Sequence, residues 1–315
     1  MGDAGTTAPT LPGWASDFCL RQRLPASYAS EVAAHASPLA RNILALRRRK
    51  GRPVIIGIAG AQGSGKTTLG RFLELWLLRE LHSRCARLSL DDVYLGRAAR
   101  LALSRSVHPL LATRGVPGTH DLPLAVRLLA ELTDGGARAV RLPRFDKARD
   151  DRAPESDWPV VTAPVEAVLL EGWCVGARPQ AEQALAGPVN ELEATGDVDG
   201  AWRRYVNHRL ETDYADLFGQ LDALVLLRVP SFNQARAWRR LQERKLRDDR
   251  PGDDAGEHGL RTDAEVDRFV MHFERLTRHM LETMPAYADS VIEVDTGHRL
   301  AQRLDRGWAF AEGAG

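Results

Sequence analysis

The sequence predicts an α/β fold in which helices cover both faces of a parallel sheet. Five short apolar segments, typical of buried strands, alternate with longer stretches of helical periodicity. A glycine-rich loop directly follows the first strand, and acidic residues stand at the ends of the second and third strands. The expected strands cover residues 54–58, 85–90, 167–171, 223–229 and 290–294. Because ligands bind beyond the carboxyl ends of such strands, we expect one site at that edge of the sheet.

The composition is that of a globular protein of 315 residues, of which 44% are hydrophobic and 27% are charged. The net charge of +1 provides no field that would favour nucleic acid or an anionic membrane as a partner. No apolar run approaches the ~18 residues of a membrane span, and the first residues lack the pattern of a secretory signal. Cys19, Cys85 and Cys174 are far apart and form no metal-binding spacing. We therefore expect a protein of the reducing cytoplasm.

The first fifty residues are expected to form a tail and a helical extension. Residues 1–13 are small and polar and contain proline, which is typical of disorder. Helical periodicity follows from Trp14 to Leu46, and Pro25 and Pro38 are expected to break it into short helices. The basic run at 47–50 is either an anion-binding patch or a solvated helix end whose charge suits the helix dipole.

Residues 60–67, GAQGSGKT, match the G-x-x-x-x-G-K-[ST] pattern of a phosphate-binding loop. Glycines let the backbone N–H groups approach an anion, and the following helix adds its dipole. Lys66 would reach the β- and γ-phosphates, and the Thr67 hydroxyl could bind Mg²⁺. A chance match is the alternative, but the strand before the loop and the helix after it argue for a nucleotide site. The expected nucleotide-binding residues are Gly60, Gln62, Gly63, Ser64, Gly65, Lys66, Thr67 and Thr68, with His298 close by.

Acidic residues at two strand ends are candidates for a catalytic base and for metal ligands. Asp91 and Asp92 follow the second strand, where a kinase needs a carboxylate to accept a hydroxyl proton or to hold metal. A helix cap is the alternative role for this pair. Glu171 ends the third strand and is expected to reach Mg²⁺ directly or through water.

The segment between the second and third strands favours an anionic acceptor. Residues 114–121, RGVPGTHD, read as a rigid turn, and Asp121 is the expected cap of a helix over 122–132. His120, within that turn, is either structural or functional. Residues 140–152 form a basic loop that could surround an anion, since arginine binds carboxylates through two hydrogen bonds. An ordinary surface loop is the alternative; its candidate substrate-binding residues are Arg144, Lys147 and Arg152.

A basic helix follows the fourth strand and begins at about residue 232. A charged loop rich in glycine and proline comes after it, so the pair suits a lid that closes on ATP. An exposed helix paired with nearby acids is the alternative. The basic residues here are Arg236, Arg239, Arg240, Arg244, Lys245 and Arg247. An amphipathic helix over 263–284, the last strand and a final helix over 300–310 are expected to complete the chain.

Seven segments together carry a resemblance to a known family. They are GAQGSGKTT (60–68), SLDDVY (89–94), HPLLATRGVPGTHD (108–121), LPRFDKARDDR (142–152), VLLEGW (168–173), YVNHRLETDYADLF (205–218) and PSFNQARAWRRLQE (230–243). The chain resembles D-glycerate 3-kinases of the plant and cyanobacterial type and related fungal kinase-like proteins. These are P-loop kinases of the group that includes uridine kinase, phosphoribulokinase and pantothenate kinase. Many families share the P-loop, whereas the motifs at 114–121, 143–147 and 170–173 in succession are much more specific.

The resemblance implies a three-layer P-loop NTPase fold with a five-stranded parallel sheet in the order 2-3-1-4-5. It implies a kinase domain over residues 51–315 with a lid at about 232–260, and transfer of phosphate from Mg²⁺-ATP to D-glycerate to give 3-phosphoglycerate. Asp91 would be the base and a metal ligand beside Thr67 and Glu171, while Lys66 and a lid arginine, Arg240 or Arg244 by position, would stabilise the transferring group. The implied acceptor residues are Asp92, Tyr94, His120, Asp121, Arg144, Lys147 and Arg152.

The sequence leaves three other functions open. The acceptor could instead be a nucleoside, a sugar or a pantothenate-like molecule. A P-loop NTPase without an acceptor would need a water-positioning element and a switch loop, and no clear candidate for either is found. A binding protein with an inactive P-loop is disfavoured because Lys66, Thr67, Asp91 and Glu171 are all intact.

Overall fold

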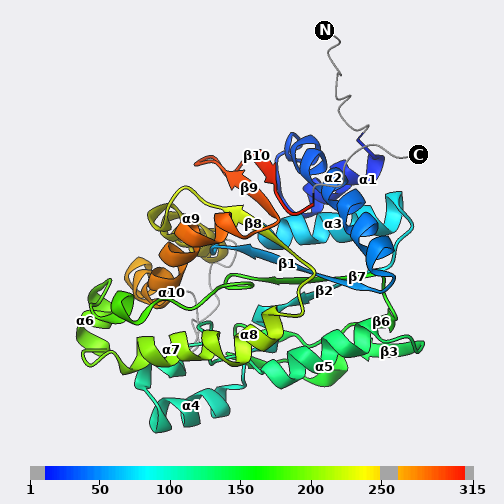
Figure 1. The fold of residues 1–315 in the computed structure, drawn as a ribbon. Helices are drawn as coiled ribbons and strands as arrows, with labels where there is room; N and C mark the ends of the chain where they lie inside the picture. The colour runs from blue at the N-terminus through cyan, green and yellow to red at the C-terminus, as the bar shows by residue number, and fades with distance from the viewer. Residues whose placement is uncertain (1–10, 249–261, 309–315) are drawn as a thin grey trace.

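A computed structural model of the chain describes residues 11–248 and 262–308 (Figure 1). Its main sheet contains five parallel strands: β1 (Val54–Gly60), β2 (Cys85–Ser89), β7 (Ala167–Gly172), β8 (Ala223–Arg228) and β9 (Ser290–Val294). Numbered 1 to 5 along the chain, they lie in the order 2-3-1-4-5. The predicted α/β fold, a mostly parallel sheet with flanking helices, is confirmed.

A sixth strand, β10 (Leu300–Asp305), pairs antiparallel with the edge strand β9. The prediction of a helix over 300–310 is therefore wrong for residues 300–305, and residues 309–310 lie outside the described part. The edge of β9 would otherwise present unpaired backbone groups, and β10 covers them. Ser290 Oγ also donates a hydrogen bond of 2.7 Å to Asp305 Oδ1, so the two strands are tied at their far ends.

Helices cover the sheet in two layers (Figure 1). One face carries α1 (Gly13–Arg21), α2 (Tyr28–Lys50) and α3 (Lys66–Glu80), and the other carries α5 (Leu122–Thr133), α7 (Ala201–Glu211) and α8 (Asp213–Phe218). Alternate residues of β1 enter the two cores: Ile56 and Ile58 pack on the first face, and Ile55 and Ala59 on the second. Burial on both faces explains why β1 reads as an uninterrupted apolar run.

Further helices and short strands complete the fold. The helices are α4 (Arg97–Ser106), α6 (Glu191–Gly196), α9 (Phe232–Asp248) and α10 (Asp263–Thr283). Two small antiparallel pairs are β3 (Arg138–Arg141) with β6 (Val160–Ala163), and β4 (Phe145–Asp146) with β5 (Asp151–Arg152). Single 3₁₀ turns are η1 (Leu90–Val93), η2 (Pro109–Ala112), η3 (Glu155–Asp157), η4 (Glu182–Leu185) and η5 (Met284–Ala286).

The N-terminal extension packs into the core around α3. The ring of Trp14 lies 4.9 Å from that of Phe72, between centroids. The expected break at Pro25 is present, but α2 continues through Pro38, so the break predicted there is wrong. A proline inside a helix costs about 3 kcal/mol, and the buried neighbours Leu39 and Ala40 offset this by packing in the core. The tail over residues 1–10 lies outside the described part.

Two expectations from the sequence concern membrane spans and cysteines. No helix in residues 11–248 or 262–308 is both long and apolar enough to cross a membrane. Cys19, Cys85 and Cys174 all carry free thiols.

Candidate active site

The loop between β1 and α3 has the backbone of a phosphate cradle. Gly63 and Gly65 have φ angles of +78° and +89°, which only glycine adopts without strain. At Gly63 there is also little space, because an added β-carbon would lie 3.0 Å from Trp238 Cβ. Lys66 then begins α3, so successive N–H groups and a helix N-terminus face the same region. The predicted local structure around the P-loop is confirmed.

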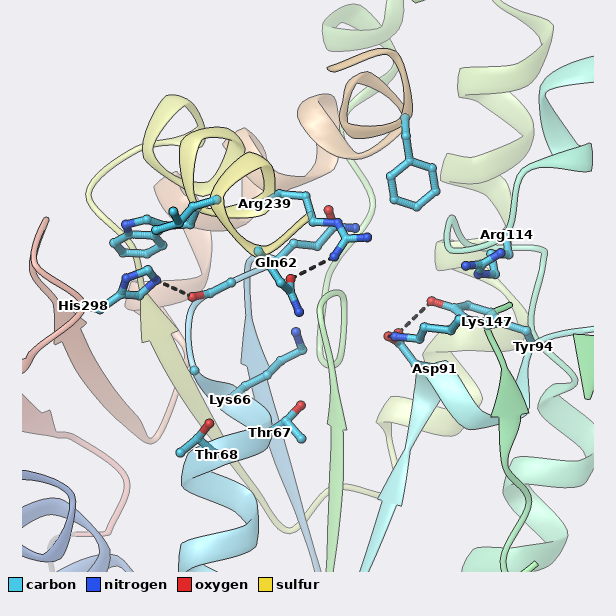
Figure 2. A pocket seen from close by; sticks show the side chains of 16 residues that line it. Gln62, Lys66, Thr67, Thr68, Asp91, Tyr94, Arg114, Lys147, Arg239 and His298 are labelled. Atoms are coloured by element: carbon cyan, nitrogen blue, oxygen red, sulfur yellow. Dashed lines mark hydrogen bonds and ion pairs between the residues drawn. The ribbon is translucent and has the colours of Figure 1, made fainter. Parts of the chain in front are cut away.

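A cavity of about 380 Å³ opens in front of this loop (Figure 2). It is bounded by four parts of the chain: the P-loop, the turn after β2 with the loops that follow, the helices α9 and α10, and the loop between β9 and β10. The side chains and glycines that line it are Gln62, Gly63, Gly65, Lys66, Thr67, Thr68, Asp91, Tyr94, Arg114, Lys147, Trp238, Arg239, Leu241, Gln242, Phe269 and His298. The structure thus brings the P-loop residues together with Asp91, Tyr94, Lys147 and His298.

Ser64 and Gln62 complete the P-loop side. Ser64 Oγ and Gln62 Oε1 are both buried and have no hydrogen-bond partner among the described residues. Gly60 lies too close to its neighbours for any side chain, since a β-carbon there would stand 2.6 Å from Ser64 Oγ. Of these two residues, Gln62 lines the cavity, and neither oxygen is bonded to another described part of the protein.

Lys66 and Asp91 face one another across the cavity. Burial lowers the pKa of Lys66, and the negative charges of Asp91 and Glu171 oppose that shift. Burial alone would raise the pKa of Asp91, but the positive charges of Lys147 and Lys66 outweigh it and hold that pKa below its usual range. The opposite charges across the pocket thus favour the charged form of both groups, and for Lys66 they partly offset the effect of burial.

Both oxygens of Asp91 are engaged. Tyr94 Oη donates a hydrogen bond of 2.7 Å to Oδ1, and Lys147 Nζ donates one of 3.1 Å to Oδ2 (Figure 2). The Lys147 side chain is 62% exposed, so it is free to reorient toward solvent. Asp91 is therefore a partly buried acid whose second oxygen is held by a largely exposed cation.

Asp92 points away from the cavity and holds the neighbouring loop. Its Oδ1 accepts a hydrogen bond of 3.1 Å from the Phe145 N–H, and its Oδ2 accepts one of 3.3 Å from Arg144 Nη1. Burial raises the pKa of Asp92, partly offset by these contacts. Neither Asp92 nor Arg144 lines the cavity, so the structure does not place these two predicted acceptor residues there. Asp92 and Arg144 are 52 residues apart in the sequence, and their contact joins the turn after β2 to the loop before β4.

Asp121 and Arg152 also support the site from outside. Asp121 Oδ1 accepts from the Leu124 N–H at 3.1 Å, which confirms Asp121 as the cap of α5. Its Oδ2 accepts a bond of 2.9 Å from Arg152, and Arg152 in turn donates to the Tyr94 carbonyl at 3.0 Å. Both residues were predicted to touch the acceptor. Neither lines the cavity, and their pairing holds the backbone of Tyr94.

His120 is buried behind Tyr94, with the two ring centroids 4.8 Å apart, and does not line the cavity. Its Nδ1 lies 2.5 Å from Tyr214 Oη, which already accepts a bond of 3.0 Å from the Gly118 N–H. The tyrosine proton therefore points to Nδ1, and the neutral imidazole carries its own proton on Nε2. Burial lowers the pKa of His120 to about 3. The contacts of His120 with described residues are therefore structural ones at this turn.

The lowered pKa of His120 predicts that acid destabilises the fold. The unfolded chain binds a proton at this histidine below a pH of ~6.5, whereas the folded chain does not. The free energy of unfolding should therefore fall by about 1.4 kcal/mol for each pH unit below ~6.5 on account of this group. Denaturant titrations between pH 8 and pH 5 would measure the slope. His120→Asn, whose oxygen can replace Nδ1, should show a smaller slope; an unchanged slope would contradict the assignment.

Arg114 lines the cavity although the sequence did not single it out. It forms an ion pair with Asp150 and stacks over Phe145, with its guanidinium carbon 5.4 Å from the ring centroid. Asp150 is held from behind by Arg100, which is completely buried and also donates to the Leu95 carbonyl at 2.7 Å. A fixed guanidinium therefore stands on the same side of the cavity as Asp91 and Lys147.

Glu171 offers an oxygen suited to a cation. Its Oε1 accepts a bond of 2.7 Å from Arg87, while its Oε2 is buried without a hydrogen-bond partner among the described residues. Thr67 lies on the cavity wall at the first turn of α3. No group of three or more histidine, cysteine, aspartate or glutamate side chains in the described part could bind a metal by itself. These donors fit Mg²⁺ that is bound together with phosphate oxygens and water.

Arg240 and Arg244 do not line the cavity. They form ion pairs with Asp267 and Asp263 of α10, so these acids turn both guanidinium groups away from the phosphate region. The neighbouring Arg239 lines the cavity instead, held at 2.8 Å by Gln242. The rest of the predicted lid, residues 249–260, lies outside the described part.

Trp238 and His298 line the cavity next to Gly63 of the P-loop. Their rings stack with centroids 3.7 Å apart and an interplanar angle of 26°. His298 Nε2 donates to the Gly63 carbonyl at 2.8 Å, as the dashed line in Figure 2 marks. The prediction placed His298 near the P-loop, and the structure does so; Trp238, Leu241 and Phe269 had no sequence signal beyond their apolar helical spacing.

Known proteins that are similar in sequence to this chain include two kinases. A relative in Schizosaccharomyces pombe, the uncharacterized kinase mug58, is 34% identical over 231 residues, which are 71% of this chain and 79% of that protein. The chloroplastic D-glycerate 3-kinase of Arabidopsis thaliana is 32% identical over 263 residues, or 80% of this chain. The chain spans about half the length of that plant enzyme, 53% of it.

Solved structures show the same fold. The D-glycerate 3-kinase from Cryptococcus neoformans superposes with a TM-score of 0.70 at 24% identity, covering 87% of this chain and 99% of the fungal one. No model of a protein family matches the chain. The P-loop geometry, the opposing acid and the similarity to mug58 over most of both chains lead to one conclusion. The chain belongs to this family of ATP-dependent P-loop kinases, together with D-glycerate 3-kinase.

Proposed function

We propose that this kinase phosphorylates D-glycerate on its 3-hydroxyl group, using Mg²⁺-ATP. The observation that carries the proposal is the surroundings of Asp91: a carboxylate flanked by Lys147 and Arg114, opposite Lys66 across the cavity. A hydroxyl group needs the acid, and a carboxylate in the same small molecule needs the cations. The similarity to the plant enzyme supports this choice of acceptor.

In this proposal, the acceptor carboxylate binds between Arg114 and Lys147. Binding draws Lys147 Nζ away from Asp91 Oδ2, which then accepts the hydrogen bond of the acceptor hydroxyl. Without the neighbouring lysine, the pKa of Asp91 rises toward its usual value, and the carboxylate becomes a better base. One side chain would thus both recognise the anion and release the base.

The transfer itself moves one phosphoryl group. The acceptor oxygen forms a bond to the γ-phosphorus, its proton passes to Asp91, and the bond from the γ-phosphorus to the β-bridging oxygen breaks, leaving ADP. Lys66 stabilises negative charge on the phosphates, and Arg239 is the described lid-side arginine placed to do the same. Thr67 and Glu171 would hold Mg²⁺, which supplies further charge stabilisation when bound.

An assay of ADP release across a panel of acceptors would test the proposal. D-glycerate, a nucleoside, pantothenate and a sugar would each be offered with Mg²⁺-ATP, and the product of each active pair would be identified by mass spectrometry and NMR. We expect turnover with D-glycerate and formation of 3-phosphoglycerate. Turnover only with another acceptor would refute glycerate, and equal ADP release without any acceptor would refute an acceptor kinase altogether.

Lys147→Met should raise the KM for D-glycerate about tenfold or more, because it removes a charged hydrogen bond worth about 1.5–3 kcal/mol. The KM for ATP should stay within about twofold of wild type, since the lysine lies on the acceptor side in the proposal. Arg149→Met is the matched control: it lies two residues away on the same loop, its side chain is 76% exposed, and it does not line the cavity. A raised KM for ATP with an unchanged KM for D-glycerate would place Lys147 on the nucleotide instead.

A further inference from the structure

Helix α2, the second helix of the N-terminal extension, binds the start of strand β10 just after His298. Leu300, the first residue of β10, is bound at both ends of its backbone by two side chains of this helix. Its N–H donates to Glu31 Oε1, and its carbonyl accepts from His35 Nε2 at 3.1 Å. Because a carbonyl only accepts, His35 must carry its proton on Nε2. Figure 1 shows α2 and β10 side by side.

Helix α2 is itself packed into the hydrophobic core. Glu31 and His35 stand four residues apart, so they share one face of α2. Between them Val32 and Ala33 are buried in the core, as is Ala36 beyond them. His35 itself is only 7% exposed. The position of Leu300 is therefore fixed relative to the core, not merely to a surface helix.

The strand in turn places His298 at the nucleotide. His298 is two residues before Leu300 and has a φ of +64°, in the left-handed region that few non-glycine residues adopt. Its ring donates to the Gly63 carbonyl and stacks on Trp238 of α9. Gly63 belongs to the P-loop, and both His298 and Trp238 line the cavity. A continuous series of contacts thus joins α2 to the P-loop and to α9, the helix that carries Trp238.

The contacts place a second group of α2 near the same loop. Tyr28 Oη, in the first turn of the helix, lies 3.9 Å from where a β-carbon of Gly65 would stand. Gln22, in the connection before α2, accepts a bond of 2.9 Å from Arg71 of α3. The extension therefore borders the P-loop and α3.

We propose that Glu31 and His35 are positioning residues for ATP, acting through Leu300 and His298 on the P-loop and Trp238. The extension would then be part of the nucleotide site, and its loss would weaken ATP binding without touching the acceptor. This inference rests on the nucleotide half of the proposed function and does not depend on which acceptor is used.

Calorimetric titration of Mg²⁺-ATP into the full chain, without acceptor, would measure the effect directly. Glu31→Ala should raise the Kd for ATP about tenfold, from the loss of a charged hydrogen bond that fixes Leu300. Glu31→Gln keeps an accepting oxygen and should stay within about threefold of wild type. Ser30→Ala is the matched control, because Ser30 is exposed on the same helix and its hydroxyl donates to the Ser27 carbonyl. The KM for D-glycerate at saturating ATP should not change in any of them.

The route through His298 can be tested by a double-mutant cycle. His298→Ala should raise the Kd for ATP, and combining it with Glu31→Ala should add little, because both remove the same arrangement. Full additivity, or an unchanged Kd in Glu31→Ala, would overturn the inference. If Glu31→Ala does not fold, Glu31→Asp withdraws the carboxylate by one methylene while keeping its charge, and should weaken ATP binding in the same direction. Failure of the wild-type chain to bind ATP would instead refute the proposed function.

Discussion

Lys66→Ala is expected to lower kcat by about 10³-fold, because it removes a preorganised positive charge from the transferring phosphoryl group. The lysine begins α3 at the inner end of the cradle and faces Asp91 across the cavity. Its desolvated position makes the charge more effective than it would be in water. The measurement is steady-state ADP release with D-glycerate and ATP both saturating.

The chain offers a matched control for this variant. Lysine occurs at only four positions, 50, 66, 147 and 245. Lys50 ends α2 and forms an ion pair of 3.3 Å with Asp222, remote from the lining of the cavity. Lys50→Ala should therefore keep kcat within about twofold, as is usual for substitutions away from a site. Near-normal turnover in Lys66→Ala would mean that the P-loop does not serve phosphoryl transfer.

Asp91→Asn is expected to lower kcat by about 10²–10⁴-fold while ATP binding is retained. The amide oxygen can still accept the hydrogen bond from Tyr94, so the local structure should persist. The variant cannot accept a proton, and it also loses the attraction that holds Lys147. Pre-steady-state measurement of product formation, together with the Kd for ATP, would separate the chemical step from binding.

Asp92→Asn is the matched control for Asp91→Asn. We expect the Asp92 carboxylate to hold the neighbouring loop and to take no part in proton transfer. It binds the Phe145 N–H and Arg144 and does not line the cavity. We expect a lower melting temperature with a smaller change in kcat than for Asp91→Asn. If the two variants showed the reverse ranking, the assignment of Asp91 as the base would be wrong.

Local chemistry made much of this molecule predictable from its sequence. The P-loop and its flanking elements follow from glycine conformation and a buried apolar strand, and the cap at Asp121 follows from side-chain length and spacing. Asp91 and Glu171 could be placed at one edge because parallel strands end there. These inferences required no knowledge of distant partners.

Other features depend on partners far along the chain. Residues 300–305 become a strand because the edge of β9 is available, which no local pattern of theirs reveals. Arg239 and Arg240 point in directions about 100° apart on one helix, and the acids of α10 decide which of them faces the cavity. The sequence makes Arg144 a candidate for the acceptor, but it does not reveal that Arg144 donates to Asp92. Arg114 had a detectable signal, since it opens the RGVPGTHD turn, but its direction depends on Asp150.

The ion pair between Lys147 and Asp91 also affects a competing reaction, the attack of water on the bound ATP. While Lys147 holds Oδ2 and Tyr94 holds Oδ1, both carboxylate oxygens are engaged. A water molecule in the cavity then meets an acid whose pKa the lysine lowers, so the carboxylate is a weaker base toward it. In the proposed reaction, the carboxylate of the acceptor draws the lysine away. The futile hydrolysis of ATP would thus be suppressed by one exposed lysine until the proper substrate arrives.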